Sequence, residues 1–147
     1  MPPDPREDRA HAKCAEANKR PAESVTVRQC LIVDDSRMIR GLSRRIAEGL
    51  GYTVLEGENG HEALTRCQME MPDLILLDWD MPVMTGIEFV KALRALPNGW
   101  HPRVMFCTSK SSAQDIHKGI DAGADDWIVK PFDEPTMRTK LGKLLAD

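Results

Sequence analysis

Five short runs of apolar and β-branched residues recur along the chain, and segments of mixed polarity separate them. The runs lie at residues 30–33, 52–55, 74–77, 104–107 and 127–129. The first, third and fourth are continuously apolar rather than alternating, which is typical of strands that are covered on both faces. Such a chain is expected to form a parallel sheet with helices on each side.

The segments between these runs have the spacing of helices with one buried face. Apolar residues step by three and four in the sets Ile39, Leu42, Ile46, Leu50; Ile87, Val90, Leu93; Ile116, Ile120; and Met137, Leu141, Leu144. The pairs Asn59 and Glu62, Thr85 and Glu88, and Ser111 and Gln114 have the spacing of a capping box at a helix start. The sequence therefore predicts a (βα)₅ order with right-handed crossovers, in a doubly wound, three-layer α/β sandwich.

Residues 1–27 differ in composition from the rest of the chain. They hold four prolines and five residues of each charge sign, and past Met1 only Val25 and Val27 are strongly apolar. We expect this segment to be a disordered or weakly helical tail. Residues 28–147 are then expected to form one domain, which carries the whole net charge of −3.

Composition excludes several classes of protein. The chain has 20 basic and 23 acidic residues, so it lacks the basic excess of a nucleic-acid or anionic-membrane binder. No apolar run approaches the roughly 20 residues of a membrane helix, and residues 1–20 contain no apolar core of a secretory signal. The four cysteines form no CxxC pair and no zinc pattern, which favours free thiols. We therefore expect a cytoplasmic protein without nucleic-acid or membrane partners.

Carboxylate, hydroxyl and ammonium groups follow the predicted strands, at the edge where doubly wound proteins bind ligands. These groups are Asp34 and Asp35, Asp78 and Asp80, Thr108 and Lys110, and Lys130. Carboxylates so close together repel unless a cation compensates them, and Mg²⁺ favours hard oxygen ligands and phosphate. Because a carboxylate can attack phosphorus while Thr108 and Lys130 contact phosphoryl oxygens, the pattern predicts phosphoryl transfer with Mg²⁺.

Residues 28–147 resemble the receiver domain of two-component response regulators, of the single-domain chemotaxis-regulator type. The matching stretches are residues 33–36, 59–63, 77–82, 84–86, 123–124 and 130–132. The resemblance implies a flavodoxin-like fold with strand order 2-1-3-4-5. It also implies that a histidine kinase or histidine phosphotransfer protein donates a phosphoryl group, and that the signal passes through phosphorylation-dependent protein contacts. Catalysis would be limited to autocatalytic phosphoryl transfer to the receiver's own aspartate and hydrolysis from it.

The resemblance assigns roles to four aspartates. Asp78 would be the phosphoacceptor and would become 4-aspartylphosphate. Asp35 and Asp78 would ligate Mg²⁺ directly, together with the backbone carbonyl of Asp80. Asp34 would act on the metal through a bound water.

The resemblance also implies a switch. Thr108 and Lys130 would bind the phosphoryl oxygens, with a cis bond before Pro131 aiming Lys130 inward. Thr108 would move toward Asp78 and make room for an aromatic side chain, usually Tyr or Phe, which here is Trp127. Because an indole is bulkier than a phenol, we expect a changed two-state equilibrium or an outward Trp127 that anchors a partner. A partly buried edge-strand tryptophan is the simpler alternative.

Three more features bear on how the receiver would work. Asp80 and Lys110 flank the path of attacking water in the family, so a pair between them would slow self-dephosphorylation; two solvated charges are the alternative. Arg37, Arg40 and Arg44 share one helical face, which would either dock on the phosphodonor or be solvated. The chain ends at the fifth helix, so we expect output through an unknown partner on the face of the fourth helix, fifth strand and fifth helix, or a relay.

Two other functions remain open. A degenerate receiver would act as a phosphorylation-independent interaction module, although such modules normally lose an acidic residue, the Thr or the Lys. A haloacid-dehalogenase-like phosphatase also forms an aspartyl-phosphate, and residues 78–80 resemble its DxD motif. Against it, Pro82 stands where that motif has Thr or Val, and the domain lacks a cap insertion.

Overall fold

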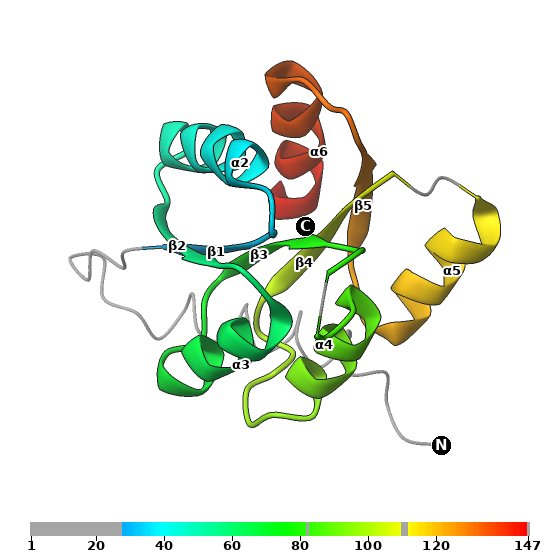
Figure 1. Cartoon of the computed structure of the whole chain (residues 1–147). Coiled ribbons are helices and arrows are strands. Elements are labelled where there is room, and N and C mark those ends of the chain that lie inside the picture. Colours follow the sequence, from blue (N-terminus) through cyan, green and yellow to red (C-terminus); the bar gives the residue numbers. More distant parts are fainter. Residues whose placement is uncertain (1–27, 82, 110–111, 147) are drawn as a thin grey trace.

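The computed structural model describes residues 28–81, 83–109 and 112–146. Within these ranges one sheet of five parallel strands runs in the order β2-β1-β3-β4-β5 (Figure 1). The strands are β1 (Gln29–Val33), β2 (Thr53–Gly57), β3 (Leu74–Asp78), β4 (Arg103–Thr108) and β5 (Asp126–Val129). The predicted fold class and strand order are therefore confirmed. The predicted tail at residues 1–27 lies outside the described residues.

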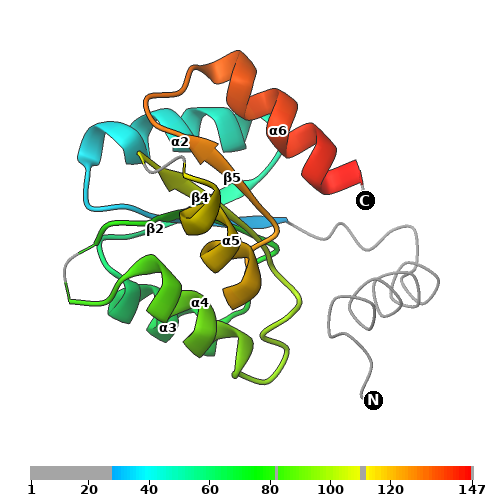
Figure 2. The ribbon, with the colours of Figure 1, turned by 90° about the vertical axis from the view of Figure 1, so that its right-hand side faces the viewer.

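Helices cover both faces of the sheet and complete the three layers. The helices are α2 (Arg37–Gly49), α3 (Gly60–Met69), α4 (Gly86–Arg94), α5 (Ala113–Ala122) and α6 (Glu134–Ala146). Figures 1 and 2 show α2 and α6 on one face, and α3, α4 and α5 on the other. The fourth and fifth helices of the predicted unit are thus α5 and α6. No described helix is both long and apolar enough to span a membrane.

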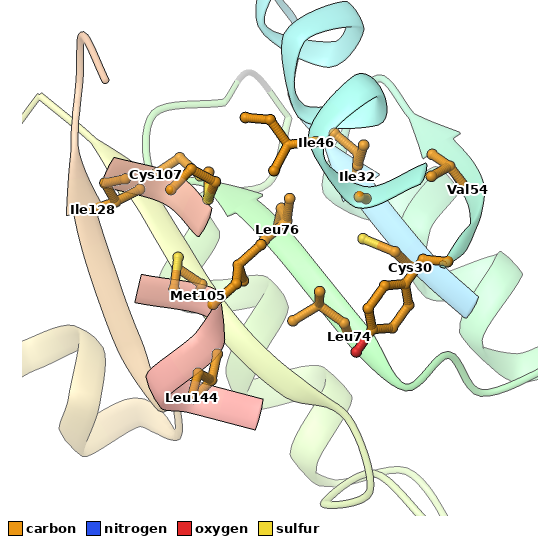
Figure 3. Close-up of a cluster of buried hydrophobic side chains, with 14 residues drawn as sticks. Cys30, Ile32, Ile46, Val54, Leu74, Leu76, Met105, Cys107, Ile128 and Leu144 are labelled. Atoms are coloured by element: carbon orange, nitrogen blue, oxygen red, sulfur yellow. The ribbon is translucent and has the colours of Figure 1, made fainter. Parts of the chain in front are cut away.

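The continuous apolar runs are explained by two separate cores, one on each face of the sheet. Alternate strand residues such as Cys30, Leu74 and Leu76 pack against α2 and α6 (Figure 3). Their neighbours, such as Leu31 and Ile75, pack against α3 and α4 on the opposite face. Because successive side chains of a strand point to opposite faces, both sets must be apolar.

Helix starts follow the predicted caps in two cases and shift by one residue in a third. Asn59 caps α3, and Thr85 with Glu88 forms a complete capping box at α4. At α5 the predicted Ser111 cap is wrong: Ser112 Oγ accepts the Asp115 backbone N–H at 3.2 Å, and its hydroxyl donates to Asp115 Oδ2 at 2.8 Å. The acidic Asp115 in the first turn also suits the positive end of the helix dipole, which favours Ser112 as the cap.

Candidate functional site

The register of the sheet brings the predicted site residues to one edge. Val33 pairs with Leu77, so Asp34 emerges from β1 level with Asp78 at the end of β3. The register between β4 and β5 pairs Thr108 with Val129, the residue before Lys130. Since all strands are parallel, their carboxyl ends meet at this edge.

Three carboxylates form a compact acidic cluster at this edge. Asp34, Asp35 and Asp78 each offer one oxygen, and these oxygens lie within 4.8 Å of one another. Asp34 and Asp78 are buried, whereas Asp35 is exposed. The Asp80 backbone N–H donates to Asp78 Oδ1 at 3.3 Å, which holds the turn after β3 over the cluster. The donor set is one that Mg²⁺ accepts: few protein oxygens, hard ligands and an exposed side for water.

Lys130 bridges two members of the cluster. Its Nζ donates to Asp34 Oδ2 at 2.9 Å and to Asp78 Oδ1 at 3.0 Å. The Lys130 backbone N–H donates to the Thr108 carbonyl at 2.7 Å, and the Lys130–Pro131 peptide bond is cis. The ammonium therefore stands between two buried carboxylates and partly neutralises their mutual repulsion.

Burial dominates the electrostatics of Asp78. Burial first, and then the charge of Asp34, raises the pKa of Asp78 from 3.8 to about 6, against the lowering effect of Lys130 and the Asp80 N–H. Burial alone would lower the pKa of Lys130, but hydrogen bonds and charge from Asp34 and Asp78 raise it overall. At neutral pH the site thus holds an ionised Asp78 beside a protonated lysine.

Thr108 lies on β4, which is next to β3, and Trp127 lies on β5, the edge strand beyond β4. Thr108 is buried at the end of β4. The Trp127 ring is partly buried against the core that packs on α3 and α4, and Lys140 Nζ of α6 lies 4.6 Å from the ring centroid. Lys140 Nζ also lies 3.5 Å from Asp126 Oδ1. Trp127 in this structure is a partly buried edge-strand side chain, and its part in a switch stays a prediction.

The residue after Asp78 also packs closely. The rings of Trp79 and Phe106 have centroids 4.8 Å apart and are inclined by 54°. Gly119 of α5 lies against both rings, so that a Cβ at this position would sit 2.9 Å from Trp79 and 3.0 Å from Phe106. A glycine is needed here because it lets α5 approach the aromatic pair beside the site.

Two of the three arginines that share one face of α2, Arg40 and Arg44, form ion pairs with Glu56 of β2. Arg40 Nε donates to Glu56 Oε1 at 3.0 Å and Arg44 Nε donates to Glu56 Oε2 at 2.7 Å, while Arg37 is exposed. Neither a free docking face nor a solvated face describes Arg40, whose side chain is 12% exposed. The sequence pattern indicated no role for Glu56 at the end of β2. The strand order β2-β1-β3 places this end of β2 beside the loop after β1.

Of the expected pair of Asp80 and Lys110, the structure describes only Asp80. Asp80 is exposed, whereas Lys110 lies outside the described residues, as does Pro82. Their effect on dephosphorylation stays a prediction.

The family model of the response regulator receiver domain matches residues 30–142. The chain belongs to this receiver family. Chemotaxis protein CheY of Halobacterium salinarum is 36% identical to this receiver over 119 residues, which are 81% of this chain and 98% of that protein. The phosphate regulon transcriptional regulatory protein PhoB of Escherichia coli is 35% identical over 114 residues, or 78% of this chain but 50% of PhoB. The receiver therefore spans half of the length of PhoB.

Solved structures agree with this assignment. The chemotaxis response regulator CheY4 of Vibrio cholerae superposes with a TM-score of 0.77 at 36% identity, covering 81% of this chain and 99% of that one. A CheY-like receiver domain protein of Methanospirillum hungatei gives a TM-score of 0.74 at 28% identity, covering 82% and 95%. The protein is a CheY-like receiver and not a classical enzyme, which sets aside the phosphatase alternative.

Proposed function

We propose that this receiver accepts a phosphoryl group on Asp78 from a phosphohistidine of a histidine kinase or histidine phosphotransfer protein. The observation that supports this most is the bridge from Lys130 to Asp34 and Asp78, at 2.9 and 3.0 Å, inside a three-carboxylate cluster. An Asp78 carboxylate oxygen attacks phosphorus, the P–N bond breaks, and the donor imidazole keeps the electron pair and takes a proton.

Mg²⁺ fits the same cluster. Asp34, Asp35 and Asp78 would hold it with the backbone carbonyl of Asp80, and the ion supplies charge neutralisation at the phosphoryl oxygens. Asp78, like Asp34, is buried and accepts a hydrogen bond from Lys130. Its Oδ1 is held by Lys130 Nζ and the Asp80 N–H before the donor arrives, which lowers the cost of alignment.

The remaining site residues would read the phosphorylated state. We assign Lys130 and Thr108 to the phosphoryl oxygens, because both lie at the edge where Asp78 ends β3. Movement of Thr108 would shift the Trp127 ring. The ring would then either leave Lys140 or stay in contact with it. In this view residues 28–147 are the functional unit of a two-component or phosphorelay pathway, with residues 1–27 as its tail.

Output would pass through the face formed by α5, β5 and α6. A surface groove of about 520 Å³ lies between β5 and α6 on this face, lined by Asp126, Pro135, Thr136, Thr139, Lys140 and Lys143. Lys140 contacts both this groove and the Trp127 ring. A change in the ring would therefore alter the groove, which is why we place the partner here.

Intact-protein mass spectrometry tests the proposal. The full chain is incubated with acetyl phosphate and Mg²⁺, and we expect the added mass of one phosphoryl group, lost with a chelator and absent in Asp78→Asn. Asp133→Asn, which replaces the exposed aspartate that caps α6, is the matched control and should still be modified. Failure to modify the folded wild type, or equal modification of Asp78→Asn, contradicts the proposal and favours a phosphorylation-independent module.

A further inference from the structure

The acidic loop after β1 is held from the β2 side by hydrogen bonds to its backbone. Arg40 Nη1 donates to the Asp34 carbonyl oxygen at 2.7 Å. The Asp34 N–H donates to the Gly57 carbonyl of β2 at 3.1 Å. The peptide group that joins Asp34 to Asp35 is thus held through its carbonyl oxygen by the guanidinium of α2.

The side chain of Asp34 is held as well. One carboxylate oxygen accepts the Ser36 N–H at 2.8 Å, and the other accepts from Lys130 Nζ at 2.9 Å. Both Asp34 oxygens thus have partners within the loop or across the site. The orientation of the exposed Asp35 depends on the peptide that Arg40 holds, because Asp35 follows it directly.

Glu56 keeps Arg40 in this position. One Glu56 oxygen accepts from Arg40 Nε at 3.0 Å, and the other accepts from Arg44 through Nε at 2.7 Å and Nη2 at 2.6 Å. Burial alone would raise the pKa of Glu56, but the hydrogen bonds and charges of Arg44 and Arg40 lower it overall. An ionised carboxylate between two guanidinium groups is a strong, directional anchor.

We infer that Arg40 is a positioning residue for the metal site, setting the affinity for Mg²⁺ through its bond to the Asp34 carbonyl. The inference rests on the proposed function, since it takes the acidic cluster as the Mg²⁺ site. Partners that orient metal ligands typically change metal affinity or activity by about 10- to 100-fold when removed.

Charge alone predicts the opposite result, which makes the inference testable. Arg40 carries a positive charge close to the cluster and repels a divalent cation. Replacing it with a neutral residue should strengthen Mg²⁺ binding if only charge matters. Weaker binding after loss of this charge therefore points to lost positioning.

The experiment titrates Mg²⁺ alone into the full chain and follows tryptophan fluorescence, because Trp79 adjoins Asp78, with calorimetry as a second readout. We expect Arg40→Gln to bind Mg²⁺ about tenfold more weakly. Arg44→Gln is the matched control: it removes the same charge from the same helix and the same Glu56, yet the contacts of Arg44 are with Glu56 and Glu48 rather than the loop. Its affinity should be unchanged or slightly higher.

Arg40→Lys keeps the charge but not the fork of donors, so its affinity should be intermediate. Thermal unfolding without Mg²⁺ establishes that each variant is folded, and if Arg40→Gln does not fold, Arg40→Lys decides. Unchanged or tighter binding by the folded Arg40 variant, or an equal loss in Arg44→Gln, overturns the inference. Wild type without Mg²⁺ binding overturns it together with the proposed metal site, whereas wild type that binds Mg²⁺ but is not phosphorylated contradicts the proposed function alone.

Discussion

Asp78, the proposed phosphoacceptor, lowers the stability of the folded protein when it is ionised. Its carboxylate is buried, with 5% of the residue exposed, and it faces the charge of Asp34. Lys130 offsets only part of the effect of burial and of the Asp34 charge, because the pKa of Asp78 still lies well above its ordinary value. An acid whose pKa is higher in the folded than in the unfolded state destabilises the folded state when it is ionised.

Asp78→Asn should therefore stabilise the metal-free protein in a pH-dependent way. The pKa of Asp78 is about 6 in the folded state against 3.8, so stability falls as pH rises between these values. Above pH 6 this shift corresponds to about 3 kcal/mol. Solvent screening at the edge of the site reduces that cost, so its removal should add on the order of 2 kcal/mol to the free energy of unfolding. Chemical denaturation in a chelator should show this gain at pH 7.5 and little of it at pH 4; an equal gain at both pH values contradicts the prediction.

Two elements, β5 and α6, are joined by Lys140. Its Nζ lies over the Trp127 ring and near Asp126 on the same strand. A cation over an indole face contributes about 0.5–1 kcal/mol at exposed sites. The contact ties the edge strand to the helix on the face proposed for output, so it biases the position of the ring.

Lys140→Ala should loosen Trp127 without unfolding the domain. We expect a loss of about 0.5–1 kcal/mol in the free energy of unfolding and greater exposure of the indole, measured by acrylamide quenching and by NMR of the indole N–H. Lys143→Ala, one turn away on α6, is the control and should change neither. Unchanged quenching in Lys140→Ala argues against a role for this contact.

The start of α5 depends on one of two adjacent serines. Ser112 accepts the Asp115 N–H, and loss of such an N-cap costs about 1 kcal/mol. Ser112→Ala should therefore lower the free energy of unfolding by about this amount, measured by urea denaturation. Ser111→Ala, at the cap that the sequence favoured, should be nearly neutral; the reverse ranking of the two variants is the outcome that counts against Ser112.

The whole molecule is stabilised by two cores that the sheet separates, and each contains cysteine. Cys30 and Cys107 lie in the core under α2 and α6 (Figure 3), and Cys67 lies in the opposite core. Burial raises the pKa of Cys67 to about 11 and raises the pKa of Cys30 and Cys107 further. Thiolates are the reactive form, so these groups should be inert while the fold is closed.

Thiol labelling at pH 8 should show that the three core cysteines do not react in the folded protein. A disulfide reagent should modify Cys14, expected in the tail, and leave Cys30, Cys67 and Cys107 unmodified until denaturant is added, when all four react. Peptide mapping identifies the modified positions, and Cys14→Ser serves as the control without a fast phase. Rapid modification of Cys30 or Cys107 in the native protein would show that the core under α2 and α6 opens readily.

Prediction from sequence succeeded where a local signal repeats. Continuous apolar runs such as 74–77 identified strands covered on both faces, and Thr85 with Glu88 identified a helix start. The cap of α5 was placed one residue early, because Ser111 and Ser112 each precede a suitable partner by three residues. A local pattern does not distinguish two such neighbours when the helix can begin at either one.

By itself the sequence determined the α/β order of the elements, the two-sided burial of the strands and the set of residues that follow each strand. Tertiary structure decided the contacts between side chains from different elements: Lys130 between Asp34 and Asp78, Lys140 over Trp127, and Arg40 on the acidic loop. The physical reason is the distance along the chain over which each effect acts. Hydrophobic periodicity acts within one element, whereas the partner of a buried charge depends on strand order and register, which bring distant residues to the same edge of the sheet.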